Sequence, residues 1–449
     1  MKKSVGLAIL LVLTAAMATL PSQSFAQQRI QQRERAVPPA AVTQARPASE
    51  EVLAAPLSLA EISQRFQVNE AAARAHVIEP ANVRGINSDL GYDKVRPKLD
   101  IPADLGTPPS PHLDVDAFGK ALHAKLKNSV AGYVMRLRKN GNTIYTLQWN
   151  WARTPSDGGV GWNPSRRMHI ASVSKLVTGM AMTKLLNDKG ISYDAKIINY
   201  LPSYWAKGPN INKITFRHLL THTSGFSTNS SSSSYSFMKG RVAAGVSGVG
   251  SYDYENMNFG LCRILIAIIN GNIAKNTNFP LIQDAFWDLV TVSAYQSYVQ
   301  QKIFTPAGVA NGQLDSKPGY ALAYKFPVAG GGWNSGNLVS MAGGAAWHLS
   351  VDELLNVMGT FRRKGTIMPS GKAQTMLDNG FGVDVVSNTP AGMLYNKNGK
   401  WTNNGRTEQS LAYFLPEGME LVVYANSPIT ASDTFFRTIV SDLYLANLK

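Results

Sequence analysis

The sequence predicts an α+β fold in which one antiparallel sheet is flanked by helices and carries an inserted helical lobe. Strand-like alternation of apolar residues occurs near both ends of the globular part, and helical runs fill the middle to about residue 375. Because the strands do not alternate one by one with helices, a parallel βαβ arrangement does not fit. No repeat of about 20–50 residues is present, which argues against a solenoid or a propeller.

The globular part is expected to span 112–449 as a single domain, and its elements follow one another in a recognisable order. Asn140-Gly141 is a strong hairpin signal because both residues tolerate positive φ. The helix beginning near Ser172 should end at Gly190, a residue type favoured just past helix ends. The expected elements are a helix over 117–126, strands over 132–137 and 143–149, a helix over 172–186, strands over 394–401, 411–415 and 421–424, and a final helix over 432–448.

Composition indicates a folded protein rather than a disordered chain. Of the 449 residues, 44% are hydrophobic and 16% are charged. The single cysteine, Cys262, lies in an apolar run, which favours a place in the core and excludes an intramolecular disulfide or a cysteine-based zinc site. Lys and Arg total 44 against 29 for Asp and Glu, a net charge of +15 spread without a long basic block. We interpret this positive charge first as generic surface charge. The alternative is that it binds an anionic cell-envelope surface.

The N-terminal stretch 1–26 has the pattern of a secretory signal peptide. It has a basic start, an apolar segment over 5–13 and a small-residue end at Ala26. The apolar segment is far shorter than the ~20 residues that a membrane-spanning helix needs. We therefore expect an exported protein, periplasmic or secreted.

Residues 27–111 are expected to form an N-terminal linker with a short helical hairpin. The stretch 59–74 resembles a helix-turn-helix, which in a basic chain suggests a DNA-binding module. Gln67 stands where such turns prefer Gly, and an exported protein would not meet DNA. A hairpin that packs on the domain or binds an envelope partner is favoured, and no nucleic-acid partner is expected.

The first motif with chemical meaning is Ser-x-x-Lys at Ser172 and Lys175. On a helix these positions share a face, so the amine can meet the hydroxyl and activate it as a nucleophile. The helix N-terminus would also favour a developing oxyanion. The same pattern recurs at Ser236 and Lys239, but there Gly240 is expected to interrupt any helix.

Two further triplets gain meaning from their order. Tyr254-Glu255-Asn256 offers a phenol for proton transfer and an amide that can hold a carbonyl and a lysine, or else it is an ordinary turn. Lys397-Asn398-Gly399 offers a cation on a strand whose glycine permits close approach, or else it is a solvated loop.

Together, Ser-x-x-Lys, Tyr-x-Asn and Lys-x-Gly in this order resemble the penicillin-recognising serine hydrolases: class C β-lactamases, D-alanyl-D-alanine carboxypeptidases and related esterases. The flanking segments 169–175 and 214–226 are similar to that family's nucleophile segment and to its most recognisable internal stretch. The resemblance covers about residues 115–449. It implies a β-lactamase/penicillin-binding-protein-like fold and an active site between the sheet and the helical lobe.

The resemblance also implies roles for individual residues. Ser172 would be the acylated nucleophile, and Lys175 and Tyr254 would share the general-base and general-acid work. The remaining assignments are substrate binding by Asn256, Lys397, Asn398 and Gly399, and an oxyanion hole formed by the backbone N–H groups of Ser172 and Lys400. Neither a metal nor a cofactor is implied.

Departures from the family pattern bear on the substrate, which is expected to be a small molecule or of peptidoglycan type. Glu255 stands where the β-lactamases usually carry Ser, and Asn398 stands where Thr is usual. Retention of Lys397 favours an anionic substrate. We expect a hydrolase of D-amino-acid peptides, esters or β-lactams, and the alternative is a penicillin-binding sensor that acylates without turnover.

One further pair of residues has the spacing of a metal site. His218 and His222 have the i, i+4 spacing of a metal-binding helix, but Leu219 replaces the glutamate of His-Glu-x-x-His. Local hydrogen bonding by both histidines is the favoured interpretation.

Overall fold

The computed structural model describes residues 111–279, 281–429 and 436–449, together with the backbone of Ile86–Asn87. The expected signal peptide over 1–26 and the helix-turn-helix-like stretch 59–74 lie outside the described residues. The part expected as linker contributes one described strand, Ile86–Asn87, which pairs with the sheet.

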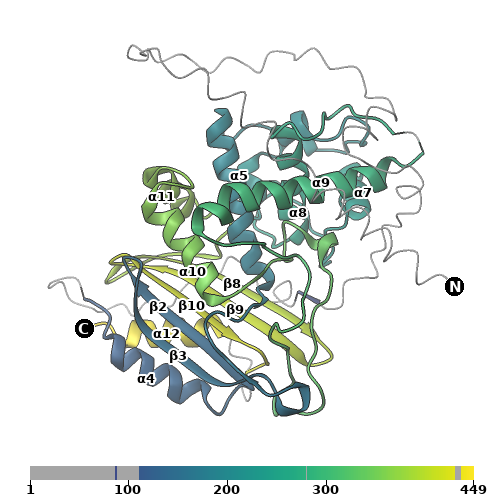
Figure 1. Cartoon of the computed structure of the whole chain (residues 1–449). Helices are drawn as coiled ribbons and strands as arrows, with labels where there is room; N and C mark the ends of the chain where they lie inside the picture. Colours follow the sequence, from purple (N-terminus) through teal and green to yellow (C-terminus); the bar gives the residue numbers. More distant parts are fainter. Residues whose placement is uncertain (1–85, 88–110, 280, 430–435) are drawn as a thin grey trace, which may run out of the picture.

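A single antiparallel sheet of eight strands forms the base of the molecule, in the order β1-β8-β9-β10-β2-β3-β4 with β7 beside β8 (Figure 1). Strand β10 lies between β9 and β2, so the sheet joins strands from both ends of the domain, as predicted. The strands are β1 (Ile86–Asn87), β2 (Gly132–Lys139), β3 (Asn142–Arg153), β4 (Val160–Gly161), β7 (Val385–Thr389), β8 (Gly392–Asn403), β9 (Arg406–Leu415) and β10 (Met419–Ala425).

The hairpin predicted at Asn140-Gly141 is present. Both residues have positive φ, 52° and 88°, as a two-residue type I′ turn requires. The turn joins β2 to β3 in antiparallel register. The C-terminal strands predicted from alternation are confirmed as β8, β9 and β10, each longer than its sequence pattern suggested.

Strand β10, in the middle of the sheet, is buried on both faces. Leu421 and Val423 belong to the core cluster on the face covered by helices α4 (Val115–Leu126) and α12 (Phe436–Ala446). Val422 and Tyr424 belong to the cluster on the opposite face, beneath the helical lobe. This alternation follows from the two-residue period of a strand. The final helix, expected over 432–448, is described from residue 436 onward.

The lobe inserted between β4 and β7 is mainly helical and lies on one side of the sheet (Figure 1). Helix α5 is buried along most of its length and ends at Gly190, whose φ of 67° fits the predicted C-cap. No helix in the described part of the chain is long and apolar enough to span a membrane. The lobe's helices are α5 (Ser174–Lys189), α6 (Phe216–Leu220), α7 (Tyr235–Ala244), α8 (Asn256–Ile269), α9 (Gln283–Val299), α10 (Val351–Gly359) and α11 (Ser370–Asp378).

A second, two-stranded sheet pairs β5 (Met168–His169) with β6 (His348–Leu349). Strand β5 leads directly into the turn that carries Ser172, so this pairing fixes the entry to helix α5. Ile170 N donates to Trp347 O at 2.9 Å, which continues the contact beyond the strand.

Candidate active site

Ser172 lies in a buried 3₁₀ turn, Ala171–Val173, immediately before helix α5. The sequence placed it at the start of the helix, and the structure adds this tighter turn ahead of the helix. Lys175 lies in the first turn of α5, and its Nζ is 2.9 Å from Ser172 Oγ. Ala171 has a φ of 45°, a left-handed value unusual for alanine, so the backbone is strained beside the serine.

The ammonium of Lys175 is surrounded by three acceptors. Its Nζ donates to Ser172 Oγ at 2.9 Å, to Asn256 Oδ1 at 2.6 Å and to Gly344 O at 2.9 Å. Three oxygens of the protein therefore lie within hydrogen-bond distance of this nitrogen. The lysine is thereby held in one orientation toward the hydroxyl.

Tyr254 lies between two lysines. Lys397 Nζ donates to Tyr254 OH at 3.1 Å, and the Nζ atoms of Lys397 and Lys175 are each 4.8 Å from the centre of the tyrosine ring. His222 stacks on the same ring at 4.3 Å. Two nearby cations stabilise negative charge on the phenol oxygen, which suits a group that passes protons.

The two histidines make local hydrogen bonds, as predicted. Thr215 N donates to His218 Nδ1 at 3.2 Å in the capping box of helix α6. Glu255 N donates to His222 Nδ1 at 3.1 Å. The stacking of His222 on Tyr254 was not predicted, because sequence spacing pairs it only with His218.

Asn256 links the lysine to the serine-rich loop. Its Oδ1 accepts from Lys175, and its Nδ2 donates to Ser231 O at 2.8 Å. The neighbouring Glu255 is buried and accepts from the backbone N–H of Thr228 and, at 2.6 Å, from its hydroxyl. The Tyr-x-Asn triplet therefore holds the loop as well as the lysine.

Lys397, Asn398 and Gly399 lie buried in strand β8, not in a solvated loop. A Cβ added to Gly399 would come within 2.5 Å of Ile170 O and 2.8 Å of Ser172 N. Only glycine permits this close approach of the strand to the nucleophile turn. The three triplets, far apart in sequence, therefore meet at one place between sheet and lobe.

No described strand pairs with residues 397–400 on one edge of β8. Strand β7 pairs with 392–396 and β1 pairs with 401–402. Asn398 N donates to Asp384 Oδ2 at 3.1 Å, so its N–H points to this edge. Alternate residues of a strand point their N–H groups the same way, so Lys400 N–H is directed to the same edge. This direction is compatible with its expected place in an oxyanion hole.

Sequence reasoning missed two charged residues at this strand. Asp384 Oδ1 accepts from Lys397 Nζ at 2.6 Å, and Arg437 donates to Asn398 Oδ1 at 2.8 Å. Both are buried. One sequence signal was present for Asp384, which is an acid within the apolar stretch 381–386 and so needs a partner if buried.

His169 and Glu408 form a second buried polar pair, behind the nucleophile turn. His169 Nδ1 is 2.8 Å from Glu408 Oε2, and the other ring nitrogen contacts Ala345 O, next to the Gly344 carbonyl that holds Lys175. Burial raises the pKa of the Glu408 carboxyl. The pair connects strand β9 to the segment that positions the lysine.

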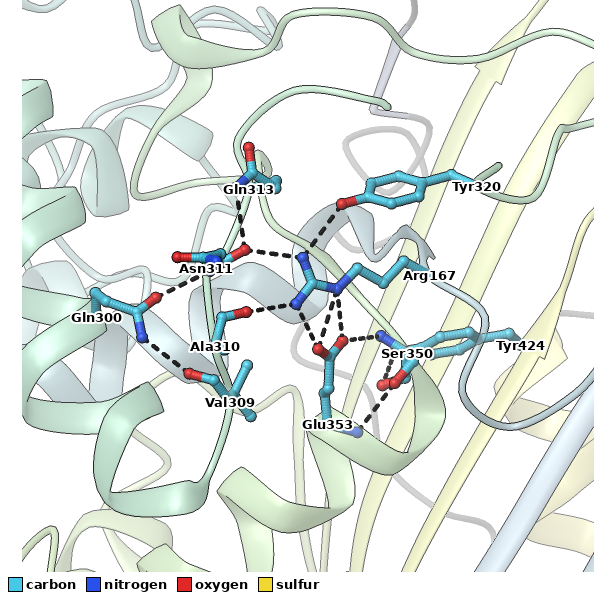
Figure 2. Close-up of polar contacts among 11 residues, drawn as sticks. Arg167, Gln300, Val309, Ala310, Asn311, Gln313, Tyr320, Ser350, Glu353 and Tyr424 are labelled. Atoms are coloured by element: carbon cyan, nitrogen blue, oxygen red, sulfur yellow. Dashed lines mark hydrogen bonds and ion pairs between the residues drawn. The ribbon is translucent and has the colours of Figure 1, made fainter. Parts of the chain in front are cut away.

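Arg167, two residues before His169, anchors the same segment from outside (Figure 2). Its guanidinium donates to Glu353 at the start of helix α10 and, at 2.8 Å each, to the carbonyl oxygens of Ala310 and Asn311. Glu353 also accepts from Ser350 N at 2.9 Å, completing the capping box of α10. Strand β5 is therefore tied to a helix and to a loop before it reaches the serine.

The second Ser-x-x-Lys copy has none of these features. Ser236 is exposed on helix α7, and Lys239 Nζ is 2.9 Å from Asp284 Oδ1. The expectation that Gly240 interrupts the helix is wrong, since α7 continues to Ala244. A single glycine is tolerated there because tertiary packing outweighs its low helix propensity. Cys262 is buried in α8, as predicted, and burial raises the pKa of its thiol.

The buried carboxyl of Glu255 predicts a pH-dependent stability. Burial raises its pKa above the ordinary 4.5, so the folded state binds this proton more tightly than the unfolded chain. Its contribution to stability is full below pH 4.5 and is lost as pH rises through the folded pKa. We expect Glu255→Gln to reduce that loss, so that the free energy of unfolding falls less between pH 4 and 8 than in the wild type, measured by urea unfolding.

The matched control is Glu417→Gln, at an exposed turn before β10, which should leave the pH dependence of unfolding close to that of the wild type. A Glu255→Gln protein whose free energy of unfolding falls as steeply with pH as the wild type would contradict the assigned cause.

Comparisons with known proteins give consistent results. The Beta-lactamase family model matches residues 115–273. The putative penicillin-binding protein PbpX of Bacillus subtilis is 24% identical over 173 residues, which are 36% of this chain and 38% of PbpX. The aligned part of this chain therefore spans less than two fifths of that relative.

Solved structures share the fold. The octameric penicillin-binding protein homologue from Pyrococcus abyssi aligns with a TM-score of 0.56 at 16% identity, covering 70% of this chain and 74% of that one. A class C β-lactamase from Rhodobacter sphaeroides aligns with a TM-score of 0.51 at 19% identity, covering 74% and 98%. The expected α+β, β-lactamase/penicillin-binding-protein-like fold is confirmed.

Proposed function

We propose that this chain, whose residues 115–273 match the Beta-lactamase family model, is a serine hydrolase that acts through an acyl-enzyme. The observation that carries the proposal is the buried contact of Lys175 Nζ with Ser172 Oγ at 2.9 Å. A serine hydroxyl needs such a neighbouring group to act as a nucleophile at neutral pH.

In the proposed reaction, Ser172 Oγ attacks the carbonyl carbon of an amide or ester. Lys175 reacts as the neutral amine and accepts the hydroxyl proton, and Tyr254 takes that proton from Lys175 while giving its own phenol proton to the leaving nitrogen or oxygen, whose bond to the carbonyl carbon breaks. The N–H groups of Ser172 and Lys400 stabilise the oxyanion of the tetrahedral intermediate. A water molecule then attacks the ester of Ser172, releasing the acid and restoring the hydroxyl.

The proposed substrates are D-amino-acid peptides, esters or β-lactams, met outside the cytoplasm if residues 1–26 direct export. We assign to Asn256 the orientation of the substrate amide, because its side-chain amide lies beside Lys175 and can both donate and accept hydrogen bonds. Gly399 supports the assignment of strand β8 to substrate binding, because it lets the strand lie close to Ser172. The proposed reaction uses side chains and backbone groups of the chain alone.

The test is the intact mass of the protein against time after mixing with a penicillin or with a short-chain ester. We expect an adduct whose mass equals that of the acyl group, mapped by peptide mass to the segment with Ser172. Rapid decay of the adduct with release of opened penicillin would indicate a β-lactamase. A persistent adduct would indicate a carboxypeptidase or the penicillin-binding sensor.

Labelling of Ser236 instead of Ser172, or the absence of any adduct together with no ester hydrolysis, would refute the proposal. Both serines are present in the same sample, so each acts as the internal comparison for the other.

A further inference from the structure

The cation on which the resemblance relies for binding an anionic substrate already has an anionic partner inside the protein. Lys397 Nζ is 2.6 Å from Asp384 Oδ1, and both side chains are at least 98% buried. The second oxygen of Asp384 accepts from Asn398 N at 3.1 Å. Both carboxylate oxygens are thus used, and the group is fixed in place.

The position of Asp384 follows from strand pairing. Val385 in β7 lies opposite Asn396 in β8, and Asp384 N donates to Asn396 O at 2.8 Å. Asp384 therefore lies immediately before β7, beside residues 396–398 of β8. Its carboxylate contacts Lys397, the lysine expected to receive a substrate carboxylate.

Arg437, a second cation that contacts the triplet, lies on the opposite face of the sheet from Lys397. Side chains of consecutive strand residues point to opposite faces of a sheet. Lys397 points toward Tyr254 in the lobe, whereas Asn398 points toward Arg437 in helix α12. The sheet therefore separates Arg437 from the Tyr254 phenol and from Ser172.

We infer that Asp384 makes this a site for substrates that are neutral where related enzymes bind a carboxylate. This inference rests on the proposed function and narrows its substrate class to uncharged esters and amides. A carboxylate placed at Lys397 would face the fixed negative charge of Asp384 and would lose its hydration without gaining an unpaired cation. A neutral group at the same place is not repelled by Asp384 and has no charge whose hydration is lost.

The test compares two substrates that differ only in one charge: N-acetyl-D-alanyl-D-lactic acid and its primary amide. In the wild type, we expect kcat/KM for cleavage of the shared ester bond to be roughly tenfold or more higher for the primary amide than for the acid. Asp384→Asn keeps the shape of the side chain and removes its charge, and it should shift this ratio roughly tenfold toward the acid. Asp378→Asn, an exposed charge change on helix α11, should leave the ratio unchanged.

A wild type that prefers the acid, or a folded Asp384→Asn protein with an unchanged ratio, would overturn the inference. Circular dichroism establishes folding. If the single variant unfolds, Asp384→Asn/Lys397→Gln removes both charges together, and its ratio should move toward one. A ratio that stays at the wild-type value would overturn the inference.

A fluorophosphonate probe separates this inference from the proposed function. If neither compound is turned over, each is tested for its ability to block probe labelling of Ser172. This competition gives the ratio of their affinities in place of the ratio of kcat/KM. Stronger protection by the acid than by the amide overturns the substrate inference alone. Failure of the probe to label Ser172 in the wild type overturns the proposed function and this inference with it.

Discussion

Replacing Ser172 by alanine is expected to abolish acylation while the protein keeps its fold. The hydroxyl is the proposed nucleophile, so the acylation rate should fall by about 10⁴-fold or more. The change removes one small buried group whose partner, Lys175, keeps its bonds to Asn256 and Gly344. Stability should therefore change by only about 1 kcal/mol. Probe labelling and a thermal melt measure the two effects.

Ser236→Ala is the matched control, because Ser236 begins the second Ser-x-x-Lys pattern but is exposed on helix α7. It should acylate at the wild-type rate. Unchanged labelling in Ser172→Ala, with loss in Ser236→Ala, would contradict the assignment of the nucleophile.

The predictable part of the site was the part written in short local patterns. Ser172 and Lys175 are three residues apart at the start of a helix, so helical geometry alone brings them together. The Ser172 copy was preferred because Gly240 was expected to interrupt a helix after Ser236, and because apolar residues follow Ser172 in its own helix. The first reason is wrong, and the two copies differ instead in burial. That burial is seen in α5, whereas Ser236 is exposed.

The unpredicted part depends on pairing between distant segments. Glu408 meets His169 across 239 positions, and no periodicity in one strand identifies its partner. Asp384 faces Lys397 only because β7 and β8 pair in one particular register. Such register depends on the whole sheet, so the charge balance of the site could not be read from the triplets themselves.

The same reasoning explains why the fold was more predictable than the substrate. Alternation in β10 and the Asn140-Gly141 turn are local signals, and each specifies an element independently of the others. The proposed substrate choice depends on the charge beside β8, where Asp384, just before β7, contacts Lys397. One carboxylate changes the interpretation of a lysine that the sequence alone associated with anionic substrates.

Replacing Lys175 by methionine is expected to slow acylation by about 10²–10⁴-fold, because the group proposed to accept the serine proton is lost. Methionine has nearly the same length, so the space in helix α5 remains filled. Asn256 Oδ1 and Gly344 O lose a donor, which costs about 1–3 kcal/mol each, and removing a buried cation offsets part of that cost. Rates of probe labelling and urea unfolding separate the chemical effect from the structural one.

The pH dependence of Lys175→Met distinguishes a lost base from a misplaced serine. Without an internal base, residual acylation should rise steadily with pH, since hydroxide must take over the proton transfer. A misplaced serine would instead lower the rate equally at every pH. Lys239→Met, in the second Ser-x-x-Lys, removes a lysine paired with Asp284 and should acylate as the wild type does. A folded Lys175→Met protein that is labelled at the wild-type rate would exclude Lys175 as the base and leave Tyr254 as the group that activates Ser172.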